Sequence, residues 1–187
     1  MILPGVTLAG LLLGFVTLQR AAELVLARHN TKKLLARGAV EAGARHYPAI
    51  VLLHAAWLGG LWLFGRDAEL RPVWLALFLL LQLLRVWVIA SLGERWTTRI
   101  IVLPGAPRWR RGPYRFVSHP NYIVVAGEIA ALPLALGLPA YALCFSLANA
   151  MVLAVRIREE NEALAAAMPV ERDALAAERY GSSSASQ

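Results

Sequence analysis

The chain has 187 residues, 58% of them hydrophobic, and a mean hydropathy of +0.54. It is more apolar than an ordinary soluble domain, so we expect a membrane domain. The formal charge of +7 does not indicate nucleic-acid binding, because the basic residues lie in short segments between hydrophobic runs, where membrane topology explains them.

Five hydrophobic runs predict five helices that enter or cross a membrane, because about 20 helical residues match the hydrocarbon core of a bilayer. In chain order, the runs cover residues 2–27, 47–64, 72–92, 122–136 and 139–155. The second and third begin near a proline, which suits the first turn of a helix. Only two residues separate the fourth run from the fifth, which predicts a tight helical hairpin. Both of these runs are short for a full span, which calls for tilt or a locally thinner bilayer.

The basic residues of the links predict the orientation. Residues 28–46 carry five lysines and arginines and residues 94–121 carry six arginines, against one glutamate in each segment, so both should be cytoplasmic. The link at residues 66–71 balances two arginines with two acidic residues and should lie outside. This alternation predicts an outside N-terminus and a cytoplasmic C-terminus.

We expect one domain and an all-α integral membrane fold. Residues 1–164 should form the membrane domain. The chain after Arg158 is rich in alanine and glutamate and ends in GSSSASQ, so we expect residues 165–187 to form a cytoplasmic tail that is partly helical and then disordered.

Residues 95–122, here called the arginine-rich segment, interleave arginines with tryptophan, tyrosine and phenylalanine. One interpretation is an interfacial loop, because tryptophan and tyrosine favour the headgroup zone and arginine snorkels there. The other is a ligand site. The clusters at residues 112–115 and 119–122 are fixed by proline and glycine, and they precede a helix whose N-terminus offers unpaired N–H groups to an anion.

Glu128 lies inside the fourth hydrophobic run. A carboxylate at membrane depth is costly enough to need a partner or a watery cavity. Two alternatives therefore stay open: an ion pair with Arg85 or a nearby loop arginine, and contact with a bound ligand.

A third polar cluster lies where the fifth run ends. A solvated helix exit explains some of its charges. Its members are Arg156, Arg158, Glu159, Glu160, Asn161 and Glu162.

In order and spacing these features resemble the isoprenylcysteine carboxyl methyltransferase family, in the wider group that includes phospholipid methyltransferases. The matching elements are Gly112-Pro113-Tyr114-Arg115, His119-Pro120-x-Tyr122, a short helical hairpin, and Arg156-x-x-x-Glu160 followed by Leu164. The fuller string is most similar to bacterial members of type III polyketide pathways, which methylate alkylpyrones or phenolic lipids. The chain departs from the family at Ser118, where an arginine is usual, and at Asn161, where a second glutamate is usual.

The resemblance implies S-adenosylmethionine as methyl donor, bound in a cytoplasmic pocket without a glycine-rich Rossmann turn, and the sequence contains no such motif. It also implies which residues lie near the cofactor: Tyr114, His119, Pro120, Asn121, Tyr122 and Glu160. The acceptor would enter laterally from the lipid. We expect Arg156 to orient the acceptor oxygen, and Glu160, or alternatively Glu128, to position or deprotonate it.

The expected function is therefore that of an S-adenosylmethionine-dependent O-methyltransferase in the bacterial cell membrane. Its acceptor would be lipophilic, either a polyketide-derived alkylpyrone or alkylresorcinol hydroxyl or a prenylcysteine carboxylate. The alternative is a non-enzymatic membrane scaffold or transporter with an intramembrane ion pair between Glu128 and Arg85. No metal site is expected, because the histidines are scattered and lack partners at ligand spacing.

Overall fold

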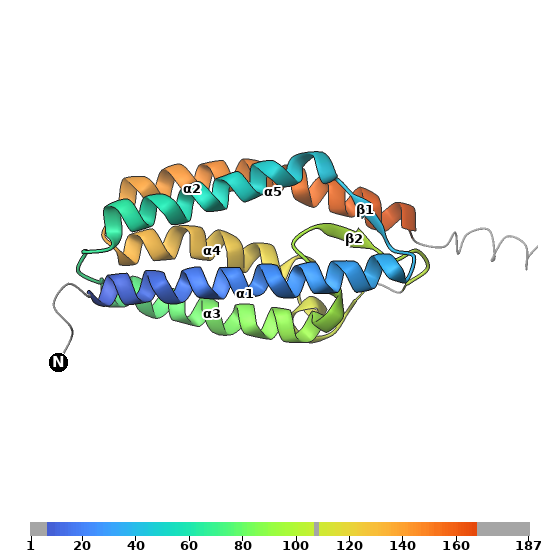
Figure 1. The fold of residues 1–187 in the computed structure, drawn as a ribbon, viewed down its shortest axis with the longest axis horizontal. Coiled ribbons are helices and arrows are strands. Elements are labelled where there is room, and N and C mark those ends of the chain that lie inside the picture. Colours follow the sequence, from blue (N-terminus) through green and yellow to red (C-terminus); the bar gives the residue numbers. More distant parts are fainter. Residues whose placement is uncertain (1–6, 107–108, 168–187) are drawn as a thin grey trace, which may run out of the picture.

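Five α-helices dominate the structure, a computed structural model that describes residues 7–106 and 109–167. They lie roughly along the long axis of the molecule (Figure 1). Their bounds are α1 Leu8–Ala36, α2 Tyr47–Gly65, α3 Pro72–Leu92, α4 Pro120–Ala135 and α5 Pro139–Ala167. Within the described residues, four helices, α1, α2, α3 and α5, are long and apolar enough to span a membrane. The predicted all-α membrane fold is thereby confirmed.

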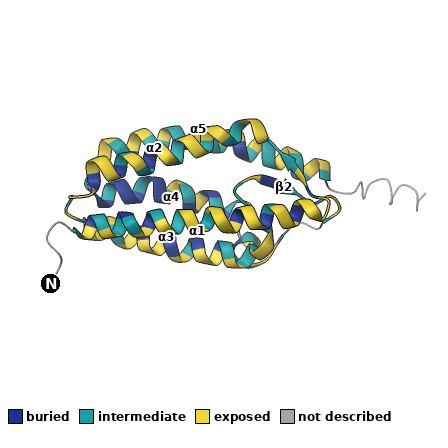
Figure 2. Ribbon diagram, viewed as in Figure 1, coloured by how far each residue is buried: buried dark blue, intermediate teal, exposed yellow. Residues whose placement is uncertain are grey.

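The shortest of the five helices, α4, is the central one. It has 16 residues, or about 24 Å at 1.5 Å per residue, and it packs on both α3 and α5. Figure 2 shows α4 as mostly buried, whereas the other helices expose much of their outer surface. Those outer surfaces carry large apolar side chains such as Leu18, Leu63 and Leu83, as expected of helices that face lipid.

The predicted hairpin between α4 and α5 is present. Gly137 has a φ of 72°, a left-handed conformation that glycine adopts without steric cost. The backbone N–H of Leu138 then donates to the carbonyl of Pro133 at 2.9 Å, which closes the end of α4. The nearby N–H of Arg71 donates to the carbonyl of Ala135, which brings the link before α3 to the same end of the bundle.

At the other end, two three-residue strands pair antiparallel: β1, Val40–Ala42, and β2, Ile100–Val102. The sequence did not predict this pairing. It joins the two basic segments, which agrees with the prediction that they share one side of the membrane. That this side is the cytosol stays a prediction.

The first helix is longer than the predicted run at residues 2–27, because α1 continues into the basic segment as far as Ala36. Tertiary contacts hold this extension. The Asn30 amide donates to the carbonyls of Gly93 and Trp96, at 3.1 and 2.8 Å, and Lys33 forms an ion pair with Glu94.

The C-terminal helix expected beyond the fifth run is present as far as Ala167, where α5 ends. The predicted domain boundary at residue 164 falls inside this helix. The rest of the predicted tail, residues 168–187, lies outside the described part of the chain.

Candidate active site

The arginine-rich segment is anchored to the end of α3 by a 3-10 turn at Gly112–Arg115. Gly112 has a φ of 57°, and a Cβ built on it would lie 2.6 Å from the Cβ of Ser91. Only glycine fits this close approach without strain. The contact fixes the position of Tyr114, two residues further on.

Tyr122 links α4 to α5, and Arg156 of α5 contacts the segment between α3 and β2. Its hydroxyl donates to the carboxylate of Glu160 and accepts a hydrogen bond of 2.9 Å from Nε of Arg156. Nη2 of Arg156, which is buried, donates to the backbone carbonyl of Thr98 at 2.8 Å. Since a buried guanidinium needs its donors satisfied, these contacts hold Arg156 in one orientation and bring α5 to the start of α4.

His119 comes immediately before α4, and its ring stacks on that of Tyr122 with centroids 5.3 Å apart. Its Nε2 lies 3.1 Å from Oδ1 of Asn161. The amide at position 161, where the family usually has a glutamate, therefore contacts the histidine instead of supplying a charge. The Cβ of Glu159 lies close to Gly43, and Glu159 is not among the residues that line the cavity between the arginine-rich segment and α5.

A cavity of about 150 Å³ lies between the arginine-rich segment and α5. Its polar wall includes Arg95, Trp109, Tyr114, Ser118, His119 and Glu160, and its apolar wall includes Leu34, Ile101, Val102, Leu103 and Leu164. Burial raises the pKa of the Tyr114 phenol above its ordinary value, and the negative charge of Glu160 raises it further. Tyr114 therefore remains a neutral hydroxyl, which can both donate and accept a hydrogen bond.

The structure brings together most of the residues proposed for cofactor binding. Tyr114, His119 and Glu160 line the cavity, and Tyr122 contacts Glu160. The other two, Pro120 and Asn121, lie in the first turn of α4. The carbonyl of Thr98 and the side chain of Leu34 were missed, because nothing in their local sequence indicates that they reach the site. Trp109 was noted only as part of the arginine and aromatic pattern.

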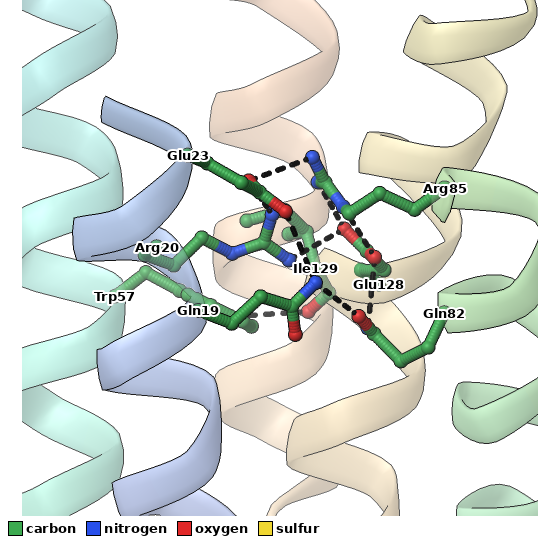
Figure 3. Close-up of polar contacts among 8 residues, drawn as sticks. All are labelled: Gln19, Arg20, Glu23, Trp57, Gln82, Arg85, Glu128 and Ile129. Carbon is green, nitrogen blue, oxygen red and sulfur yellow. Dashed lines mark hydrogen bonds and ion pairs between the residues drawn. The ribbon is translucent and has the colours of Figure 1, made fainter. Parts of the chain in front are cut away.

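Glu128 lies away from this cavity, in a buried polar cluster (Figure 3). It is 2% exposed, and its Oε1 accepts hydrogen bonds of 2.8 Å from Nε of Arg85 and from the amide of Gln82. Its Oε2 accepts from Arg85 and from Arg20. Both arginines also pair with Glu23, at 2.8 and 3.2 Å. Two arginines and two glutamates thus balance in charge and tie α1, α3 and α4 together.

The predicted ion pair between Glu128 and Arg85 is therefore confirmed, whereas contact of Glu128 with a substrate stays a prediction. No group of three or more His, Cys, Asp or Glu side chains that could hold a metal ion occurs in residues 7–106 and 109–167.

Comparison with known proteins places this sequence in a family. The sequence model described as "Isoprenylcysteine carboxyl methyltransferase (ICMT) family" matches residues 74–166, which include α4, the arginine-rich segment and nearly all of α3 and α5. "Uncharacterized protein YpbQ" of Bacillus subtilis (strain 168) is 40% identical over 159 residues, 82% of this chain and 95% of that protein. An "Uncharacterized protein" of Haemophilus influenzae is 27% identical over 164 residues, 80% of this chain and 91% of that protein.

No solved structure shows a significant match to the chain. The family match covers every residue proposed for catalysis or cofactor binding, and the relative from Bacillus subtilis is matched almost from end to end. The chain therefore belongs to the isoprenylcysteine carboxyl methyltransferase family of membrane methyltransferases.

Proposed function

We propose that the chain is an S-adenosylmethionine-dependent O-methyltransferase that acts on a lipophilic acceptor. The observation that carries this proposal is the position of Glu160. This carboxylate lines the cavity and is also hydrogen-bonded to Tyr122, whose hydroxyl is in turn held by Arg156. The carboxylate of Glu160 is thus held in one orientation beside the cavity, at the polar end of an apolar helix bundle.

The groups around the cavity fit the proposed methyl donor. S-adenosylmethionine carries an ammonium, a carboxylate and a sulfonium, and, when bound, it supplies an electrophilic methyl group. Glu160 offers a negative charge to the ammonium. Trp109 lines the cavity, and its indole N–H is buried and has no hydrogen-bond partner among the described residues, so it is a donor that a ligand could use.

Methyl transfer to oxygen is an in-line displacement, so the protein has to align the acceptor and exclude water. Arg156 holds the hydroxyl of Tyr122, and that hydroxyl orients the carboxylate of Glu160. From this position Glu160 would accept the proton of a phenol or enol acceptor, whereas a carboxylate acceptor needs no base. Arg156 would stabilise the negative charge of the acceptor oxygen, directly or through Tyr122.

The apolar wall of the cavity and the lipid-facing helices favour an acceptor with a long apolar tail. Two acceptor classes fit: an alkylpyrone or alkylresorcinol hydroxyl, and a prenylcysteine carboxylate. The two acceptor classes differ in whether methylation needs a general base. Glu160→Gln should slow methylation of a hydroxyl much more than methylation of a carboxylate.

The test is transfer of a labelled methyl group from S-adenosylmethionine to candidate lipids by purified protein in lipid nanodiscs. Glu160→Gln should lower kcat/KM at least about 100-fold, the lower range for removal of a general base. The matched control is Glu162→Gln, two residues further along α5, where an exposed carboxylate pairs with Arg158 at 2.9 Å. Wild-type turnover by the Glu160→Gln variant would contradict the assignment.

Calorimetry separates this proposal from the scaffold or transporter alternative. The ion pair that the alternative requires is present, but the balanced cluster around it is equally suited to joining helices. Binding of S-adenosylmethionine to the purified wild-type chain is expected. A chain that neither binds this cofactor nor transfers methyl groups would favour the alternative.

A further inference from the structure

The arginine-rich segment also lines a second hollow, of about 210 Å³. It is lined by Trp109, Arg110, Tyr114, Arg115, Phe116, Val117 and Ser118. Both arginines are exposed, and no acidic side chain occurs among these lining residues. The hollow therefore has a positive potential and suits an anion.

The charges of this surface are not neutralised within the described part of the chain. Other basic residues at this end of the bundle have carboxylate partners, as Lys33, Arg37 and Arg158 do. None of the ion pairs in residues 7–106 and 109–167 involves Arg110 or Arg115. The guanidinium of Arg115 lies 4.4 Å from the centre of the Phe116 ring, a contact that leaves its N–H donors at the ring's edge for a ligand.

Exposed apolar side chains adjoin the same hollow. Phe116 is 65% exposed and Val117 41% exposed, and both line the hollow. The segment also packs on Ser91, in the last turn of α3, so it lies where a spanning helix ends. Arginines beside exposed apolar groups at this depth match the layer in which lipid headgroups meet hydrocarbon.

We propose that this hollow binds the phosphate group of an anionic phospholipid. Two guanidinium groups can bind phosphate oxygens with paired, charge-assisted hydrogen bonds, and Phe116 and Val117 can contact the acyl chains below. The adjacent apolar residues favour a lipid over a soluble anion, because water would have to solvate them if the ligand had no tail.

The hollow shares Trp109, Tyr114 and Ser118 with the inner cavity, so these residues form a wall between the two. A lipid headgroup bound in the hollow would hold this wall in place. If the proposed function is correct, lipid composition then alters cofactor affinity. The lipid binding itself does not depend on that function.

The experiment measures retention of phosphatidylglycerol and phosphatidylcholine by the purified full-length chain, with native mass spectrometry in detergent. One basic residue near an anionic surface contributes about 1 kcal/mol, which is about fivefold in affinity. The variant Arg110→Gln/Arg115→Gln should therefore bind phosphatidylglycerol about 25-fold more weakly, with little change for phosphatidylcholine. The charge-preserving variant Arg110→Lys/Arg115→Lys should lose less affinity than the glutamine variant, because lysine keeps the charge but not the paired hydrogen bonds.

The matched control is Arg37→Gln/Arg158→Gln, which removes two exposed arginines from the same end of the bundle, both with carboxylate neighbours. It should change the affinity less than threefold. Equal losses in the two glutamine variants would reduce the effect to net charge and overturn the proposal. Competition by millimolar inorganic phosphate as effective as that by phosphatidylglycerol would also overturn it, since the site would then bind a soluble anion.

Discussion

The hydroxyl of Tyr122 stands between a cation and an anion. It accepts from Arg156 and donates to Glu160, while its ring is stacked on His119. The stacking fixes the ring, and the two polar contacts fix the hydroxyl. One atom thus determines how the carboxylate at the cavity is oriented.

Tyr122→Phe should lower kcat/KM about 10- to 100-fold, because a hydrogen bond to a charged group contributes about 1.5–3 kcal/mol. The ring and its stacking are retained, but Nε of the buried Arg156 loses its acceptor, so the melting temperature should also fall. Labelled methyl transfer and thermal unfolding measure the two quantities. Tyr141→Phe, which removes a hydroxyl bonded to the carbonyls of Ala56 and Trp57, is the control and should leave the rate unchanged. A normal rate for Tyr122→Phe would show that Glu160 does not need this contact.

The sequence identified Glu128 as a residue in need of a partner, and Arg85 as a candidate, because an unpaired carboxylate in hydrocarbon is so costly. It did not identify Arg20 and Gln82 as further partners. In a membrane protein the lipid-facing and core-facing sides of a helix are both apolar, so α1 has no polar stripe that tells which side turns inward. The contact between His119 and Asn161 was hidden for a related reason, since it joins residues 42 positions apart.

The helices differ in how well their ends could be predicted. Long apolar runs located α2 and α3 to within a residue or two, because few other structures tolerate such a run. The end of α1 was missed because its last turns are polar, and it is tertiary bonds from Asn30 that keep them helical. The strands β1 and β2 have three residues each, too few for an alternating pattern to be visible.

The polar cluster joining α1, α3 and α4 leads to a prediction about stability. Glu128→Met should destabilise the fold by about 3 kcal/mol, because Glu23 is then the one carboxylate of the cluster left to balance both Arg20 and Arg85. The double variant Glu128→Met/Arg85→Met should recover much of that loss, since Arg20 and Glu23 still balance each other. Thermal unfolding in detergent measures both variants.

Two results would contradict this view of the cluster. One is a Glu128→Met variant as stable as the wild type. The other is a double variant that folds well but no longer binds the acceptor, which would support the direct contact of Glu128 with substrate that the sequence left open.

On the scale of the whole molecule, the segments that link the helices lie at two opposite ends of the bundle. The pairing of β1 with β2 joins the strongly basic segments at one end, while the bond from Arg71 to Ala135 joins the short links at the other. The positive-inside rule then predicts that the end with the cavity faces the cytosol.

Accessibility of single cysteines tests this orientation. In a Cys144→Ser background, Asp67→Cys should react with a membrane-impermeant maleimide only from outside, and Arg158→Cys only from inside. Both side chains are well exposed, at opposite ends of the bundle. Labelling of both positions from one side would rule out the predicted topology, and the reverse pattern would place the cavity outside.

The length of α5 has a consequence for kinetics. Its 29 residues extend about 43 Å, against a hydrocarbon core of about 30 Å, so one continuous rod connects the oily interior to the aqueous rim where Glu160 sits. A water-soluble donor and an oil-soluble acceptor would then be sampled from different phases. Saturation with the donor depends on its molar concentration in water, whereas saturation with the acceptor depends on its mole fraction in the bilayer. Diluting a fixed amount of acceptor with inert lipid should therefore slow turnover, even when the bulk concentrations of donor, acceptor and protein stay the same.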